Sequence, residues 1–174
     1  MSLKVLKSLF LLVDIMIPNV KMWERGYCTP NYSVNKIPRG PRKRIFANGC
    51  FDLFHEGHLN LLKQASGFGD LIVGIDCDAR VKKLKGRLLF SENFRADLIS
   101  QLAFVDRVIV FDCEVEDLIQ ELRPDILVKG DDSVRPVPGQ LFTLGAGGDV
   151  FFIPCQFRNG RKISSSNFKN LTFD

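Results

Sequence analysis

The stretch FANGCFDLFHEGHLNLLKQA, residues 46–65, decides the fold of this 174-residue chain. It opens within the apolar run RIFANG, residues 44–49, which predicts a β-strand. It closes within GHLNLLKQAS, residues 57–66, whose apolar residues recur at helical spacing and predict an amphipathic helix. His55 and His58, which are the only two histidines of the chain, lie at the corner between strand and helix.

Beyond this corner the chain alternates between apolar runs and amphipathic segments. Further strands are predicted at 69–77, 106–112, 124–132 and 148–154, and further helices at 91–104, 114–123 and 164–171. Ser91 is the expected N-cap of the helix that it opens. Strands that alternate with helices are typical of parallel βαβ units. The sequence therefore predicts an α/β fold, a Rossmann-like open sheet of five parallel strands with helices on both faces.

The residues before this pattern predict a different organisation. Residues 1–42 form an N-terminal extension with a basic linker, and 43–174 form the domain. The first 20 residues resemble a secretory leader, but Asp14 interrupts their apolar run and no small-residue cleavage site follows. We expect a helix there that packs on the domain or on a second subunit, with an interfacial membrane contact as the alternative. The run PRGPRKR, residues 38–44, indicates a solvated linker rather than a nucleic-acid contact.

Composition places the chain among globular proteins, with 45% hydrophobic and 25% charged residues and a net charge of +4. The five cysteines are widely spaced, without a C-x-x-C pair; they are Cys28, Cys50, Cys77, Cys113 and Cys155. This pattern is typical of buried free thiols in a reducing compartment, and we expect a cytoplasmic protein. It does not supply the clustered ligands of a zinc site.

Polar residues follow each predicted strand at the edge of the sheet where ligands bind in this class of fold. They are Asn48, His55, His58, Asp76, Asp78, Asp112 and Lys129 to Asp132. The first helix should begin close to Gly57 or His58, and its free N–H groups and positive dipole end suit phosphate. Gly57 permits a close approach of the ligand, and the two imidazoles can donate hydrogen bonds to phosphate oxygens. The alternative is that the histidines are two unrelated surface residues.

HEGH fits the H-x-G-H signature of cytidylyltransferase-like nucleotidyltransferases, and NGCFDLFHEGH resembles their phosphate-binding opening segment. Four further segments resemble this family in the same order: GDLIVGIDCDARVKKLKG, FVDRVIVFD, LRPDILVKGDD and GRKISSSNF, with the arginine pair Arg87 and Arg95. The resemblance covers residues 44–168 and is greatest to the adenylyltransferase domain of ADP-heptose synthases. FVDRVI is also similar to the third-strand motif of glycerol-3-phosphate cytidylyltransferases.

The resemblance implies transfer of a nucleotidyl group from a nucleoside triphosphate to a phosphomonoester, by in-line attack on the α-phosphate with release of pyrophosphate. It implies catalytic roles for His55, His58 and Lys82, and substrate contacts for Lys85, Arg87 and Asp78. Nucleotide contacts are implied for Asn48, Gly49, Phe51, Asp52, Gly57, Lys129, Gly130, Asp132, Ser164, Ser165 and Ser166. Mg²⁺ should bind through the nucleotide phosphates without protein ligands. A homodimer is also implied, without nucleic acid or firm membrane association.

Several alternatives stay open at this point. We favour ATP and a sugar phosphate such as heptose 1-phosphate, but a CTP-dependent glycerol-3-phosphate cytidylyltransferase or a catalytically silent nucleotide-binding protein also fits. Glu56, at the variable position of the signature, brings a negative charge close to the phosphates. The lysines at 82, 83 and 85 can be a solvated helix face, and the three serines can be an ordinary N-cap. Asp52 can hold the first turn or order a cation.

Overall fold

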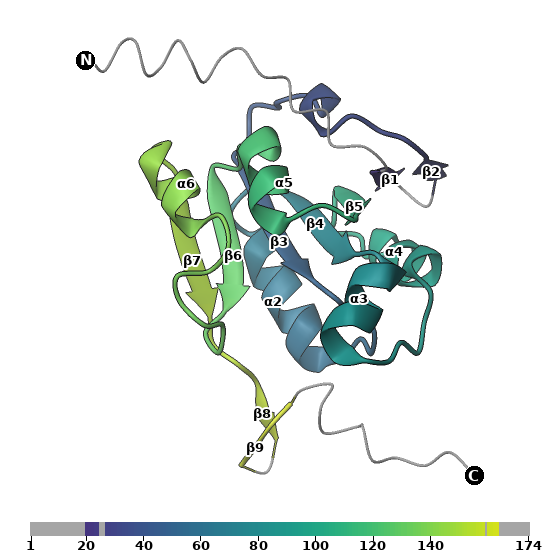
Figure 1. The fold of residues 1–174 in the computed structure, drawn as a ribbon. Helices are drawn as coiled ribbons and strands as arrows, with labels where there is room; N and C mark the ends of the chain where they lie inside the picture. The colour runs from purple at the N-terminus through teal and green to yellow at the C-terminus, as the bar shows by residue number, and fades with distance from the viewer. Residues whose placement is uncertain (1–19, 25–26, 159, 164–174) are drawn as a thin grey trace.

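The computed structural model describes residues 20–24, 27–158 and 160–163 (Figure 1). A seven-stranded sheet with the order β2-β1-β5-β4-β3-β6-β7 lies at its centre. Five neighbouring strands are parallel: β3 (Arg44–Gly49), β4 (Asp70–Asp76), β5 (Arg107–Phe111), β6 (Ile126–Gly130) and β7 (Asp149–Ile153). The predicted open parallel sheet of five strands is confirmed, and two antiparallel strands extend it.

In the described ranges, five α-helices accompany the sheet: α2 (Glu56–Ser66), α3 (Asp78–Lys85), α4 (Glu92–Ser100), α5 (Val115–Leu122) and α6 (Gln140–Gly145). Side chains of β3 alternate between two buried layers. Ile45 and Ala47 pack with residues of α2 and α4, whereas Phe46 packs with residues of α5 on the opposite face. The predicted covering of both faces is thus confirmed. Ser91 caps α4 as expected, since its side chain accepts a hydrogen bond from the Phe94 N–H.

The order of the parallel strands creates a topological switch between β3 and β6. From β3 the chain moves outward to β4 and then β5, whereas from β6 it moves outward in the other direction to β7. Neighbouring connections therefore leave the two central strands toward opposite faces. In open α/β sheets, ligands bind in the crevice expected at the carboxyl ends of the strands beside such a switch. The site described below lies around this position.

A hairpin that the sequence did not predict extends the sheet beyond β5. It comprises β1 (Lys21–Glu24) and β2 (Tyr27–Thr29), and β1 pairs antiparallel with β5. Trp23 of β1 is 4% exposed and belongs to the core layer that α2 and α4 cover. The described part of the N-terminal extension is therefore packed against the domain. The boundary after residue 42 stays a prediction, and the helix expected before residue 20 lies outside the described residues.

The basic run is exposed over residues 38–43, in agreement with the predicted solvated linker, and only its last residue, which begins β3, is buried. Arg44 is 8% exposed and donates hydrogen bonds to the carbonyl oxygens of Leu122 and Ile37. Arg39 forms an ion pair with Asp125. Backbone carbonyls at the ends of elements thus hold the run against the sheet.

The cysteines and the chain end complete the description. Four of the cysteines, Cys50, Cys77, Cys113 and Cys155, are free thiols as predicted, but they are half-buried rather than fully buried. After β7 the chain forms an unpredicted hairpin of β8 (Phe157–Arg158) and β9 (Arg161–Lys162). The helix predicted over 164–171 lies outside the described residues. Over the described ranges, no helix has the length and apolar character needed to cross a bilayer.

Candidate active site at the start of α2

The two histidines lie together at the N-terminus of α2. His55 is the N-cap residue, and its Nδ1 accepts a hydrogen bond of 3.4 Å from the backbone N–H of His58. The helix therefore begins at Glu56, one residue earlier than predicted. The imidazole rings stack with their centroids 3.7 Å apart and an interplanar angle of 18°. The pair is thus one structural unit and not two unrelated surface residues.

Aromatic side chains enclose this pair. Phe51, which is buried and has a positive φ of 50°, meets the ring of His58 edge-on with a centroid distance of 5.0 Å. Phe54 lies 5.7 Å from the same ring. The predicted contact residue Phe51 therefore supports His58 from within the turn that follows β3.

Burial makes both imidazoles neutral at physiological pH. It lowers the pKa of His58 to about 3, and the neighbouring charges of His55 and Lys85 act in the same direction. The pKa of His55 is also lowered, again mainly by burial. The Nδ1 atom of His58 is buried without a hydrogen-bond partner among the described residues. The Nε2 atom of the same ring is not among these buried, unpartnered atoms. Nε2 is therefore the ring nitrogen that remains open to a ligand.

Gly57 lets the end of the described chain, at Ile163, approach the first turn of α2. A Cβ at Gly57 would lie 3.1 Å from the ring of His55 and 3.4 Å from the carbonyl oxygen of Ile163. The absence of a side chain thus allows both close approaches. Ile163 is the last described residue, and the three predicted serines, Ser164, Ser165 and Ser166, lie outside the described range.

The acidic residue in the H-x-G-H signature is compensated within the chain. Glu56 forms an ion pair of 2.6 Å with Arg158 of β8. The negative charge that the sequence places in the first turn of α2 thus has a positive partner. Only the tertiary structure reveals this pairing, because the two residues lie 102 positions apart.

A second polar group lies at the topological switch. Lys129, at the end of β6, donates a hydrogen bond to Oδ1 of Asn48, at the end of β3. Burial lowers the pKa of Lys129 to about 8, against an opposing effect of Asp76. Gly49 and Gly130 are the last residues of the same two strands. The predicted residues of these two strands are therefore side by side.

The carboxylates that follow β6 have partners in the chain. Asp132 accepts a hydrogen bond from Lys162 of β9, and this contact lowers the pKa of Asp132. Asp131 accepts one of 3.0 Å from the backbone N–H of Cys155. These contacts join the β6 loop to the C-terminal hairpin near the histidine pair, since Asp132 also influences the pKa of His58.

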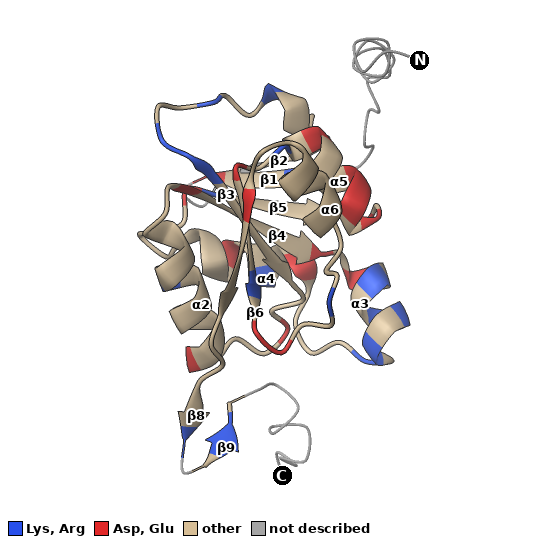
Figure 2. Ribbon diagram, turned by 90° about the vertical axis from the view of Figure 1, so that its left-hand side faces the viewer, with Lys and Arg blue, Asp and Glu red and all other residues tan. Residues whose placement is uncertain are grey.

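The lysines of α3 differ in their relation to the histidines. The charge of Lys85 contributes to the lowered pKa of both His55 and His58. The side chains of Lys82 and Arg87 are exposed and form no hydrogen bond or ion pair within the described part of the chain. Lys and Arg residues gather on α3 and on β9 (Figure 2). The structure thus places Lys85, rather than Lys82, close enough to affect the pair.

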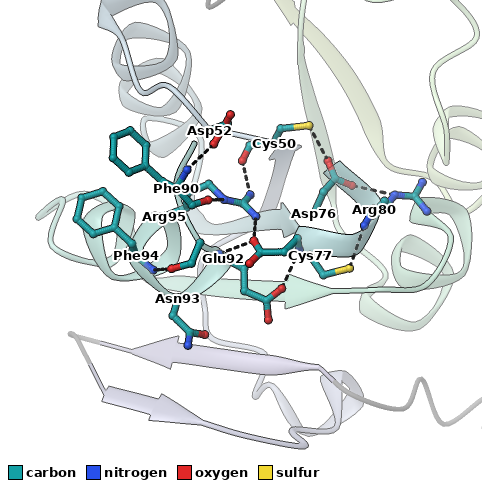
Figure 3. Close-up of polar contacts among 12 residues, drawn as sticks. Cys50, Asp52, Asp76, Cys77, Arg80, Phe90, Glu92, Asn93, Phe94 and Arg95 are labelled. Carbon is teal, nitrogen blue, oxygen red and sulfur yellow. Dashed lines mark hydrogen bonds and ion pairs between the residues drawn. The ribbon is translucent and has the colours of Figure 1, made fainter. Parts of the chain in front are cut away.

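Two of the predicted carboxylates hold the loop between α3 and α4 (Figure 3). Asp52 accepts hydrogen bonds from the backbone N–H groups of Leu89 and Phe90, at 3.0 and 2.9 Å. Asp78 accepts one from Arg95 at 2.8 Å. Asp52 thus fixes the loop before α4, a role that the sequence did not predict, and its contact with a cation stays a prediction.

Arg95, which the sequence singled out only as one of an arginine pair, lies at the centre of this network (Figure 3). Its side chain is 1% exposed and also donates to the carbonyl oxygens of Cys50 and Phe90. It thereby joins the turn after β3, the start of α3 and the loop before α4. Its position on the face of α4 that carries the buried residues Ala96 and Ile99 was the available signal.

The remaining carboxylates lie farther along the edge of the sheet. Asp76 is buried and forms an ion pair of 2.9 Å with Arg80, and it accepts a hydrogen bond from the thiol of Cys50 (Figure 3). Asp112, after β5, is exposed, and no hydrogen bond or ion pair joins it to the described site. The expected convergence thus extends from β6 across β3 to β4 but does not include Asp112.

Known proteins resemble this chain over most of its length. The family model for cytidylyltransferase-like proteins matches residues 46–170. The bifunctional protein HldE of Campylobacter curvus is 52% identical over 98 residues, which cover 54% of this chain and 21% of that protein. HldE of Citrifermentans bemidjiense is 44% identical over 128 residues, or 71% of this chain and 26% of that protein. The chain thus spans about a quarter or less of the length of these relatives.

Solved structures share the fold. The lipopolysaccharide core biosynthesis protein of Thermoplasma volcanium has a TM-score of 0.55 and 28% identity, with 68% of this chain and 99% of that chain covered. The pantoate-beta-alanine ligase of Francisella tularensis has a TM-score of 0.54 over 80% of this chain and 69% of its own. At 18% identity, this second likeness shows the fold alone.

Proposed function

The chain belongs to the cytidylyltransferase-like family, and from this we propose that it is a nucleotidyltransferase that joins a nucleoside triphosphate to a sugar phosphate. The observation that carries the proposal is the stacked pair of neutral imidazoles, His55 and His58, at the start of α2. Its position beside the switch between β3 and β6 is where ligands bind in open α/β sheets. The motifs shared with ADP-heptose synthases support ATP as the nucleotide and heptose 1-phosphate as the acceptor.

In this reaction a phosphate oxygen of the acceptor forms a bond to the α-phosphorus. The bond from that phosphorus to the bridging oxygen breaks, and pyrophosphate leaves with the electron pair. Nε2–H groups of the neutral imidazoles donate hydrogen bonds to phosphate oxygens on which charge accumulates in the transition state. The first-turn N–H groups of α2 add to this stabilisation. Because no covalent intermediate is needed, positioning and charge neutralisation account for the catalysis.

Mg²⁺ fits this site as a group that enters with the nucleotide. The ion prefers oxygen ligands and keeps several waters, and it is commonly held through substrate phosphates. At the start of α2, the side chains that could face the ion are imidazole nitrogens rather than oxygens. The carboxylate of Asp132 already pairs with Lys162. These donors do not form an all-protein cage. When bound, Mg²⁺ supplies positive charge to the phosphate oxygens, while the residues of the chain orient them.

The remaining predicted contacts belong to the proposal as well. The approach of Ile163 to Gly57 supports a role for the following residues, Ser164, Ser165 and Ser166, in holding the β- and γ-phosphates. The influence of Lys85 on both histidines supports a contact of that lysine with phosphate. Lys82 and Arg87, which are exposed, are assigned to phosphate contacts through the family motif.

The proposal is tested by incubating the protein with ATP or CTP, Mg²⁺ and candidate acceptors, and by measuring the pyrophosphate released. The acceptors are heptose 1-phosphate, glycerol 3-phosphate and phosphoethanolamine. We expect release with ATP and heptose 1-phosphate. Preference for CTP with glycerol 3-phosphate would instead identify the cytidylyltransferase. Nucleotide binding without release from any pair would identify a silent binding protein.

His58→Ala is the matched catalytic variant in this assay. Removing a donor that acts on transition-state charge should lower kcat by about a hundredfold or more while the far-UV circular dichroism spectrum stays unchanged. Unchanged turnover in the folded variant would contradict the role of His58.

We also propose that the protein forms a homodimer, as the family resemblance implies. Light scattering coupled to size-exclusion chromatography gives the molar mass directly. A mass near 19.7 kDa, that of one chain, would contradict the dimer.

A further inference from the structure

The hydrogen bond between Lys129 and Asn48 joins the two central strands at the topological switch. Lys129 is a half-buried cation whose hydrogen-bond partner is a neutral amide and not a carboxylate. Burying an ammonium group is costly unless it is paired, and a single amide oxygen satisfies only one of its three N–H groups. A function other than folding therefore best accounts for a lysine at this position.

The chemistry of the contact fixes the orientation of the Asn48 amide. An ammonium group has donors only, so it bonds the amide oxygen and never the amide nitrogen. The NH₂ group of Asn48 is thereby turned away from Lys129. This NH₂ group donates to no acceptor within the described residues. It is also not a buried, unpartnered group, so solvent or a ligand can reach it. A donor of fixed direction is thus left open at the crevice.

We propose that Lys129 is a positioning residue of the transferase, and that its ammonium group holds the Asn48 amide so that the NH₂ group donates to an oxygen of the bound nucleoside triphosphate. This inference rests on the proposed function and deepens it. Gly49 and Gly130, which end the same two strands, allow a close approach of the Phe51 ring and of the Asp132 carboxylate, since a Cβ there would lie 3.3 Å and 2.6 Å from them.

The charged groups around Lys129 allow a pH test. Its pKa is about 8, and the neighbouring charge that acts on it is that of Asp76, at the end of β4. Asp76 ends β4 and pairs with Arg80, and Cys50, which bonds Asp76, has a raised pKa. His58 has a pKa of about 3, and burial also lowers the pKa of His55. A neutral amine can accept as well as donate, so loss of the proton at Lys129 releases the amide to rotate.

The experiment uses the full chain with three variants and a control. Lys129→Met keeps the length and removes the donor, Asn48→Ala removes the amide, and the double variant closes a thermodynamic cycle. Lys63→Met is the matched control, because Lys63 is exposed in the last turn of α2. The apparent KM for ATP, kcat and the calorimetric affinity for the same nucleotide are measured across pH. Urea midpoints report the folding of each variant.

We expect each single variant to weaken nucleotide binding about tenfold or more, as for loss of a hydrogen bond to a charged group. The double variant should be no weaker than Asn48→Ala alone, because Lys129 acts through the amide. Wild-type affinity should fall as the pH rises through about 8, and this dependence should vanish in Lys129→Met. Lys129→Arg, which keeps a permanent donor, should restore affinity without the pH dependence.

Other results overturn the inference. Unchanged affinity in Lys129→Met, or additive losses in the double variant, would show that Lys129 does not act through Asn48. A lower urea midpoint with unchanged affinity would assign the pair to folding alone. If Lys129→Met does not fold, Asn48→Ala and the wild-type pH profile decide the matter. Absence of pyrophosphate release by the wild type would refute the proposed function, whereas calorimetry would still test the amide.

Discussion

His58 is half-buried and carries a titratable ring whose pKa is strongly lowered, so its effect on stability depends on pH. The folded protein holds this imidazole neutral down to about pH 3, whereas an unfolded histidine takes a proton near pH 6.5. Stability is therefore complete above pH 6.5 and is lost as the pH falls toward 3. We expect the free energy of unfolding to decline by up to about 1.4 kcal/mol per pH unit in this window.

Urea unfolding of wild type and His58→Gln at a series of pH values checks this expectation. The variant lacks the titrating group, and its midpoint should change less between pH 6.5 and pH 3. Parallel curves for the two proteins would show that His58 is readily protonated in the folded state, against the burial that we describe.

Many site residues could be predicted because the position of a residue after a strand fixes where it lies in a parallel sheet. His55, His58, Asn48 and Lys129 follow directly from this rule, and the structure places them around the crevice. The partners of these residues could not be predicted. Arg158 neutralises Glu56 across 102 positions, a pairing that only the path of the folded chain determines.

The start of α2 depends on Gly57 having no side chain. In Gly57→Ala the new Cβ lies 3.1 Å from the ring of His55, so the ring must shift from its stacked position. We expect turnover to fall about tenfold or more through misplacement of the imidazoles. Stability should change little, because the higher helix propensity of alanine, at most about 1 kcal/mol, offsets the crowding.

Gly145→Ala is the control for this change. Gly145 ends α6, and a Cβ there would meet no atom within 4 Å. Its turnover should equal that of wild type in the pyrophosphate assay. Equal turnover of both alanine variants would contradict the crowding of His55.

Arg95 determines how the loop before α4 is held. Arg95→Met removes the charged donor of Asp78, which keeps its bond from the Glu92 N–H, and the donor of two carbonyl groups. We expect the free energy of unfolding to fall by about 3 kcal/mol. Arg42→Met is the control, since Arg42 is 57% exposed and its ion pair with Asp70 contributes at most about 1 kcal/mol. Denaturant titration measures both, and equal losses would contradict the structural role of Arg95.

Long periodic elements could be predicted, and short ones could not. The five parallel strands and α2, α4 and α5 carry apolar runs or helical periods of sufficient length. The hairpin β1–β2, the hairpin β8–β9 and the six-residue α6 are too short to show a period. Tertiary pairing forms the hairpin strands, as the contact of β1 with β5 shows.

Trp23 tests whether the N-terminal hairpin and the domain unfold as one unit. It is the only tryptophan of the chain, and it lies in the core layer beneath α2 and α4. We expect unfolding followed by tryptophan fluorescence to coincide with unfolding followed by circular dichroism, because one cooperative core contains both signals. A fluorescence transition at lower denaturant would show that the hairpin detaches first. Trp23→Ala should cost about 3–5 kcal/mol of stability.

The reversal of strand order between β3 and β6 has a consequence for how such a molecule diversifies. The loop at 86–91 follows α3, and the loop at 131–139 follows β6. Asp52 and Arg95 anchor the first loop, whereas Lys162 and the backbone of Cys155 hold the carboxylates that open the second. Because the two rims have separate anchors, a change of length in one leaves the contacts of the other in place.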